Sequence, residues 1–190
     1  MADHYKEIAT KFCELCDWLL QAWQFRKFMF EENPDFEYLK TRHHEHFFNR
    51  LQKITQEYWL LQLAKLHDPA TANKSKNLTI DYMIDYVDWE KETKLKLNDL
   101  RNRMQVLSKP TKIARNKILS HNDLNVLLDN QTLGEFQLGD DEKYFNCLKD
   151  FANIVSLEIN DSPFIFDDLV PNDIAVFMNS FKRGCKAKRA

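Results

Sequence analysis

The stretch IATKFCELCDWLLQAW, residues 8–23, carries the pattern that decides the fold. Its apolar side chains recur every three or four residues, at Ile8, Phe12, Leu15, Leu19 and Trp23. That spacing matches the 3.6-residue turn of an α-helix and not the two-residue period of a strand. The stretch therefore predicts a long amphipathic helix near the N-terminus, with this stripe facing the core.

The same helical spacing recurs in three later stretches of the chain. The residues that carry it are Phe47, Leu51, Ile54, Tyr58 and Leu61; Leu97, Leu100, Met104 and Leu107; and Tyr144, Leu148, Phe151, Val155 and Ile159. The third helix is expected to begin near Leu78, with Asn77 or Thr79 as its cap, and residues 174–181 suggest a short last helix. Because all three glycines lie beyond residue 133, a turn-rich β-domain is disfavoured. We predict an all-α fold, an up-down helical bundle with an added short C-terminal helix.

Prolines and polar runs divide these helices. Polar loops are expected over residues 65–76 and 131–141, and each of the five prolines is interpreted as a break between periodic segments. Pro110 is expected to start a helix, because its missing N–H would have no partner there. The length of 190 residues suits one domain, predicted over residues 1–185, with a basic tail over residues 186–190.

Composition narrows the class of protein. Hydrophobic residues make up 44% and charged residues 29%, a globular balance that argues against general disorder. No apolar run is long enough to span a bilayer, and the N-terminus lacks the pattern of a secretory signal. We therefore expect a soluble, cytoplasmic protein with no membrane partner.

Two clusters invite a metal-binding interpretation. Cys13 and Cys16 form a C-x-x-C pair inside the first helical pattern, but no second pair completes a zinc site, so buried packing is favoured. His43 and His46 share a spacing that can bind a metal on one helix face, with His44 beside them, yet no third ligand stands out. A polar face near the start of the second helix is the favoured interpretation. We predict no metal site and no cofactor.

The segment with the clearest chemical potential lies between residues 101 and 122. The net charge of the chain is only −2, but this segment holds six basic residues and no acid. The six are Arg101, Arg103, Lys109, Lys112, Arg115 and Lys117. Such a local positive field concentrates an anionic ligand such as an RNA backbone.

Two residues at the end of this segment suit RNA cleavage without a metal. His121 can accept or donate a proton near neutral pH, as attack by a 2′-hydroxyl requires. The guanidinium of Arg115 can stabilise the charge that develops on the phosphate, and Asn116 can orient either group. On an unbroken helix Arg115 and His121 would lie about 120° apart, so a kink or a second copy of the chain must bring them together.

These residues resemble a known signature. The pattern R-N-x-x-x-x-H, at the start of a late helix of an all-α bundle, is similar to that of the HEPN superfamily. The strings that resemble its AbiU-like abortive-infection branch are Ala114-Arg115-Asn116-Lys117, Ser120-His121-Asn122-Asp123, Leu66-His67-Asp68-Pro69 and Lys76-Asn77-Leu78-Thr79. The likeness spans roughly residues 5–160 and rests on the motif, the loop and the glycine-free helices together.

The resemblance implies a metal-independent endoribonuclease that acts as a homodimer in phage defence, in a stress response or in a toxin–antitoxin system. It assigns catalysis to Arg115, Asn116 and His121. With the basic segment, it predicts RNA-phosphate binding by Lys112, Lys117, Arg101, Arg103 and Lys109. The expected partners are RNA, a second copy and a cognate antitoxin. The alternative is a non-catalytic HEPN-like helical module that binds a partner protein or a nucleotide.

Overall fold

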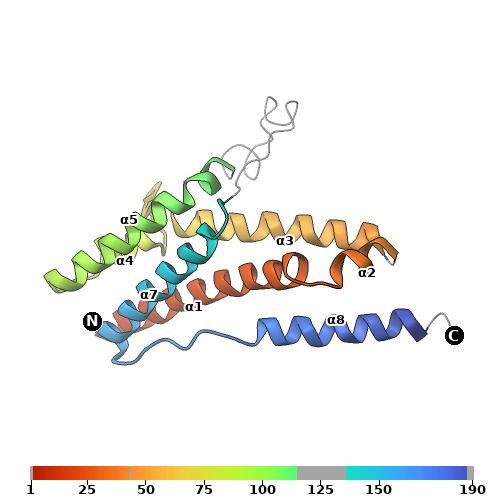
Figure 1. The fold of residues 1–190 in the computed structure, drawn as a ribbon. Helices are drawn as coiled ribbons and strands as arrows, with labels where there is room; N and C mark the ends of the chain where they lie inside the picture. Colours follow the sequence, from red (N-terminus) through yellow and green to blue (C-terminus); the bar gives the residue numbers. More distant parts are fainter. Residues whose placement is uncertain (1, 43, 115–135, 188–190) are drawn as a thin grey trace. The chain divides into compact units, whose positions relative to one another are not determined.

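The computed structural model describes residues 2–42, 44–114 and 136–187 (Figure 1). Helices make up most of it, and the only strands in the described residues form one small pair, which confirms the predicted all-α fold. Its elements are α1 (Ala2–Arg26), the π-helix η1 (Lys27–Glu31), α2 (Phe36–Arg42), α3 (Glu45–Leu66), the strands β1 (Thr71–Ala72) and β2 (Ser75–Lys76), α4 (Ile80–Asp85), α5 (Lys91–Ala114), α7 (Asp140–Asn160) and α8 (Val170–Ala187).

The chain forms two compact units, and the first comprises Met1–Trp18 and Leu60–Ile165. Its centre is the packing of α5 against α7, together with the first turns of α1. The rings of Phe12 and Phe151 lie 5.6 Å apart, and both side chains are fully buried. Leu97 and Met104 of α5 are also fully buried, so the stripes predicted for α5 and α7 do face the core.

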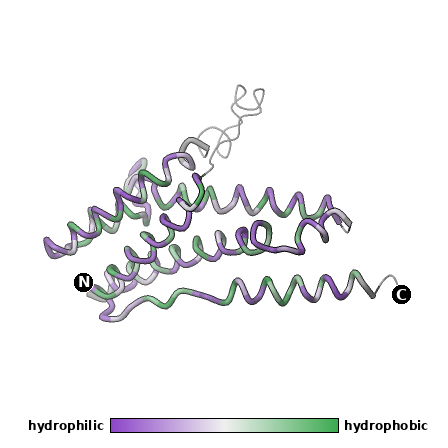
Figure 2. The backbone as a smooth tube through the Cα atoms, viewed as in Figure 1, coloured by the Kyte–Doolittle hydropathy of each residue, from purple (hydrophilic) through white to green (hydrophobic). Residues whose placement is uncertain are grey.

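The second unit comprises Leu19–Trp59 and Phe166–Ala190. Its core is a series of edge-on aromatic contacts, from Phe30 to Phe36 at 5.1 Å, on to Phe48 at 5.7 Å, and on to Phe181 at 5.4 Å. Such T-shaped pairs are favourable because the positive ring edge meets the negative ring face. Apolar and polar residues alternate along α8 (Figure 2), and this helix extends beyond the expected residues 174–181 on both sides.

The predicted core side of α3 is wrong for three of its five residues, whereas Leu51 does pack against the core of the second unit. In the predicted stripe, the exposed fractions are 57% for Phe47, 62% for Ile54 and 40% for Tyr58. Phe48 and Trp59 are buried instead, on a side about 100° around the helix. Because α3 carries apolar residues on both sides, its periodicity alone did not identify the one that packs inward.

The expected third helix is divided into two. Thr79 does cap a helix, since its hydroxyl accepts a hydrogen bond from the backbone N–H of Tyr82 at 3.2 Å. That helix, α4, ends at Asp85, and α5 begins only at Lys91. The prediction for Pro110 is also wrong, because this residue lies inside α5 and does not start a helix.

The expected loop over residues 65–76 contains a small hairpin. Thr71 pairs with Lys76 and Ala72 with Ser75 in an antiparallel register. Asn73 and Lys74 between them both have positive φ, of 48° and 74°, as a two-residue type I′ turn requires. Within the described residues, no helix combines the length and the apolar character needed to cross a membrane.

Candidate functional site

The predicted catalytic residues fall outside the described part of the chain. Arg115, Asn116, Lys117 and His121 all belong to that stretch, and the side chain of Lys112 is not described either. Helix α5 is described as far as Ala114, the residue before Arg115. The described structure therefore ends immediately before the motif. The expected convergence of Arg115 and His121 stays a prediction.

Three residues of the predicted RNA-binding set are described on α5, and they do not share one side of this helix. At about 100° per residue, Arg103 lies about 160° from Arg101 around the helix, and Lys109 lies about 80° from Arg101. Arg101 forms an ion pair with Asp81 of α4 at 3.3 Å, and Arg103 lies 3.9 Å from Asp99 one turn earlier. A phosphate would compete with these carboxylates for either arginine. Lys109 is exposed and has no ion pair with a described residue, so it is the best placed of the three to contact RNA.

The buried side of α5 changes from apolar to polar side chains toward the C-terminal end of the helix. Its apolar stripe continues as Ser108 and Thr111, which are both fully buried. The Thr111 hydroxyl donates to the backbone carbonyl of Ser108 at 2.7 Å. The Ser108 hydroxyl oxygen finds no hydrogen-bond partner in the described residues. The last turns of α5 thus present polar groups on the inner side, next to the segment predicted to do chemistry.

A buried pair of polar side chains connects the loop after α3 to α7. Nε2 of His67 lies 2.9 Å from the Tyr144 hydroxyl, and the two residues are 77 positions apart in sequence. His67 is buried and Tyr144 is fully buried. Burial raises the pKa of Tyr144 well above its usual value, and the nearby Cys16 and Cys147 thiols raise it further. The hydroxyl stays protonated, and its hydrogen bond with His67 fixes the loop that follows α3.

The cysteines of the C-x-x-C pair are part of the core. Cys13 and Cys16 are fully buried, and the Cys13 thiol lies 3.5 Å from the carbonyl oxygen of Ala152. Desolvation, with a smaller effect of Glu14, raises the pKa of Cys13 to about 12, and burial raises the pKa of Cys16 well above its usual value. Thiols held protonated in this way are poor nucleophiles and poor metal ligands, so packing explains the pair.

The two described histidines of the cluster do not lie on one helix face. His44 has a φ of 67° and lies between α2 and α3, with its ring 6.0 Å from that of Phe181. His46 is exposed in the first turn of α3, and His43 is outside the described ranges. Among the described residues, no three His, Cys, Asp or Glu side chains gather closely enough to hold a metal ion.

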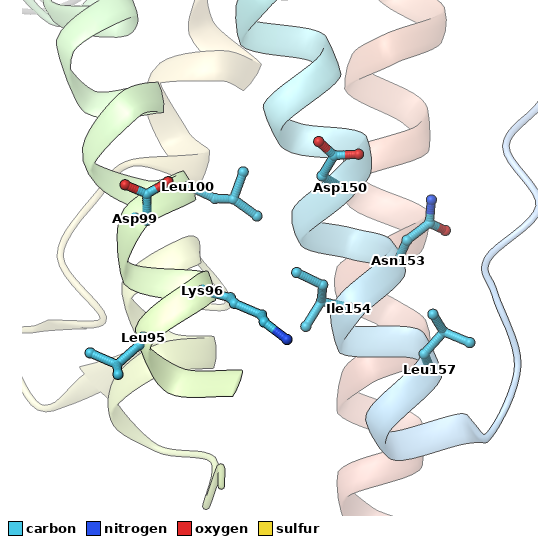
Figure 3. Close-up of a pocket in the computed structure, with 8 residues that line it drawn as sticks. All are labelled: Leu95, Lys96, Asp99, Leu100, Asp150, Asn153, Ile154 and Leu157. Carbon is cyan, nitrogen blue, oxygen red and sulfur yellow. The ribbon is translucent and has the colours of Figure 1, made fainter. Parts of the chain in front are cut away.

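An open groove of about 600 Å³ lies between α5 and α7. Lys96 and Leu100 point from α5 toward α7, where Asp150 and Ile154 face them (Figure 3). Two carboxylates and one lysine line the groove, and that lysine already contacts Glu92 at 2.8 Å. This lining lacks both a histidine and an excess of positive charge, so it does not suit an RNA backbone.

The fold defines the class first: the chain is an all-α protein in which the R-N-x-x-x-x-H motif follows α5 in the sequence. A family model described as AbiU2, a HEPN family, matches residues 2–178 of the 190-residue chain. The chain therefore belongs to the HEPN AbiU2 family, and the resemblance found in the sequence is confirmed. A search of curated proteins and a search of solved structures found no match.

Proposed function

We propose that this protein is a metal-independent endoribonuclease of an abortive-infection or toxin–antitoxin system, which acts as a homodimer. The observation that carries the proposal is the family match over residues 2–178, because this range contains the intact motif from Arg115 to His121. The family suggests an abortive-infection HEPN module, and the residue types in the motif supply what RNA cleavage requires. The expected partners are RNA, a second copy of the chain and a cognate antitoxin.

The reaction would be an internal attack within RNA. The 2′-oxygen forms a bond to phosphorus while the bond from phosphorus to the 5′-oxygen breaks, which leaves a 2′,3′-cyclic phosphate. A base takes the 2′-hydroxyl proton, an acid protonates the leaving 5′-oxygen, and an imidazole such as that of His121 serves either role near neutral pH. Arg115 would stabilise the charge on the phosphate oxygens, and Asn116 would orient the phosphate or the imidazole.

The RNA backbone would be held mainly by lysines at the end of α5 and just beyond it. Lys109 is exposed in the last turns of α5, and Lys112 and Lys117 complete the proposed set. Arg101 and Arg103 would contribute less, since Asp81 and Asp99 lie beside them. This arrangement predicts a phosphate contact region concentrated next to the motif.

RNA cleavage in the presence of EDTA tests the proposal. The wild-type protein should cut RNA, His121→Ala should lose at least about 100-fold in rate, and the products should end in a 2′,3′-cyclic phosphate. His46→Ala is the matched control, because His46 is exposed on α3 and has no proposed catalytic role. The proposal fails if a folded dimeric wild type cuts no RNA, or if the His121 variant cuts as fast as the control.

The second candidate is a non-catalytic HEPN module that binds a partner protein or a nucleotide. The exposed apolar side of α3, with Phe47, Ile54 and Tyr58, is the observation that favours it. This alternative predicts that Arg115→Ala leaves function intact while Ile54→Glu abolishes it. The ribonuclease proposal predicts that Arg115→Ala abolishes RNA cleavage. It also predicts that Ile54→Glu leaves the cleavage rate unchanged when the variant and the wild type are compared in the same oligomeric state.

A further inference from the structure

The second unit holds an apolar cavity that the proposed function does not use. Its volume is about 410 Å³, which lies within the range of small-molecule sites. Seven of its eight lining residues are apolar, and they come from the end of α1, from η1, from α3 and from α8. Met29 and Ile174 are buried, whereas Phe47 and Phe177 are exposed. The cavity therefore has a closed apolar floor and an open aromatic mouth.

One wall of the cavity contains the π-turn η1. The backbone N–H of Glu32 donates to the carbonyl of Lys27, five residues earlier, at 2.9 Å. Such wide turns are rare and occur mostly as single turns, often at functional sites. The extra residue rotates the following chain by about 100° relative to an unbroken α-helix, and Phe25 before the turn and Met29 within it both line the cavity. A rare local conformation thus shapes this wall, which favours a built site over a chance depression.

The α8 side of the mouth carries negative charge. Asp173 is the one charged side chain among the lining residues, and it has no ion pair with a described residue. Between Phe166 and Phe181 the chain has two further aspartates, Asp167 and Asp168, and no lysine or arginine. A local excess of carboxylates attracts a cationic ligand and repels an anionic one. The charge at the mouth therefore selects among apolar ligands that would fit the floor equally well.

We propose that this cavity binds a small lipophilic cation, an apolar chain that carries an ammonium group. The chain occupies the floor formed by Met29 and Ile174, and the ammonium pairs with the Asp173 carboxylate at the mouth. Phe177 lies one turn after Asp173 on the same face of α8, and the face of its ring attracts the same positive charge. A fatty acid would place its carboxylate against that of Asp173. A small ligand also fits the volume of the cavity better than a whole partner helix does.

Three probes of equal chain length separate the apolar and the charged contributions. Isothermal titration calorimetry of the full-length chain without RNA compares octylammonium, octan-1-ol and octanoate, so the result does not depend on whether the chain cuts RNA. Octylammonium should bind with a dissociation constant of about 10 µM to 1 mM. The alcohol should bind at least about 3-fold more weakly, since an exposed ion pair contributes modestly, and octanoate more weakly again. A protein that binds none of the probes leaves the cavity to a side chain of a larger partner and overturns the proposal, as does octanoate that binds as tightly as octylammonium.

Asp173→Asn tests the charged contact by itself. This variant should lose the preference for octylammonium over octan-1-ol and keep the affinity for the alcohol, because the apolar floor is unchanged. Asp168→Asn is the matched control, since it removes the same charge from an exposed residue outside the lining. It should keep the preference. If both variants retain the preference, or if both lose it to the same degree, Asp173 does not hold the ammonium and the proposal is wrong.

The methionine methyl groups locate the bound probe in the wild-type chain. In NMR spectra of protein labelled at these methyls, octylammonium should shift the signal of Met29, which lines the cavity, and leave those of Met83 and Met104 in the first unit unchanged. Val170→Phe fills part of the cavity and should weaken the binding of octylammonium and octan-1-ol alike, at least about 5-fold, with circular dichroism to confirm the fold. Signals that shift at Met83 or Met104 and not at Met29 place the ligand elsewhere and overturn the proposal. Affinity that a folded Val170→Phe variant leaves unchanged overturns it too.

Discussion

Replacing Tyr144 by Phe removes one buried hydroxyl and leaves the ring in place. In the native protein that hydroxyl lies 2.9 Å from Nε2 of His67, in a site from which water is excluded. The variant leaves the imidazole nitrogen without this partner, and such a loss in a buried site costs about 1–3 kcal/mol in the free energy of unfolding. For a chain of this length the melting temperature should fall by about 2–12 °C.

Urea unfolding followed by circular dichroism measures the effect. Tyr86→Phe is the control, because Tyr86 is an exposed residue and loss of its hydroxyl should change stability by less than about 0.5 kcal/mol. A double-mutant cycle with His67→Phe should give a coupling energy of at least about 0.5 kcal/mol. If Tyr144→Phe is no less stable than the control, or if the coupling is zero, the pair does not anchor the loop.

Three further predictions concern separate parts of the chain. Phe48→Ala should lower the free energy of unfolding by about 3–5 kcal/mol, whereas Val106→Ala on the exposed side of α5 should stay within about 0.5 kcal/mol; equal losses in urea unfolding would contradict the assigned core. Because burial raises the pKa of Cys13 from 9.0 to about 12, the unfolded thiol ionises first as pH rises, and the protein should lose up to about 1.4 kcal/mol per pH unit above about pH 9. The Cys13→Ala variant, kept reduced, should lose less free energy of unfolding than the wild type between about pH 8 and about pH 10. If the difference in free energy of unfolding between the two proteins stays constant over this range, the raised pKa of Cys13 is refuted. Lys109→Ala should reduce the slope of log RNA affinity against log salt by about one, and Lys53→Ala on α3 should leave the slope unchanged in the same binding titration.

The fold could be predicted from the sequence wherever a helix has one apolar side. The stripe from Tyr144 to Val155 identifies α7, because the other buried apolar residues of this helix lie beside that stripe. Leu97, Leu100 and Met104 identify the inner side of α5, because all three are buried. Burial and periodicity agree in both helices. In such helices the local spacing of apolar residues predicts both the helix and the side that packs inward.

Where a helix is apolar on two sides, spacing is not enough. The 4-3-4 series through Phe47, Ile54 and Tyr58 is as regular as that of α7, yet Phe48 and Trp59 are the residues that pack inward. The choice between these sides depends on the partners available in the folded unit, such as Phe36 and Phe181 for Phe48. No window of sequence around α3 contains that information.

The candidate site, like the fold, could be predicted only in part from local sequence. Local motif chemistry is enough to select Arg115, Asn116 and His121 as a candidate set, but it does not reveal which described residues support them. The contact of His67 with Tyr144 joins positions 77 residues apart, and the pairing of Arg101 with Asp81 depends on how α4 lies against α5. The only local signal for His67 was the Leu66-His67-Asp68-Pro69 string, which suggested a relationship and no contact.

Pro110 inside α5 has a consequence for anyone who engineers this protein for robustness. A helix-interior proline has no N–H to donate one turn back, to the carbonyl of Val106, and costs about 3 kcal/mol relative to alanine. A stability screen would therefore favour its removal, five residues before Arg115. Because residue 110 lies so close to the motif in sequence, variants that a heat screen selects at this position should be checked for activity first.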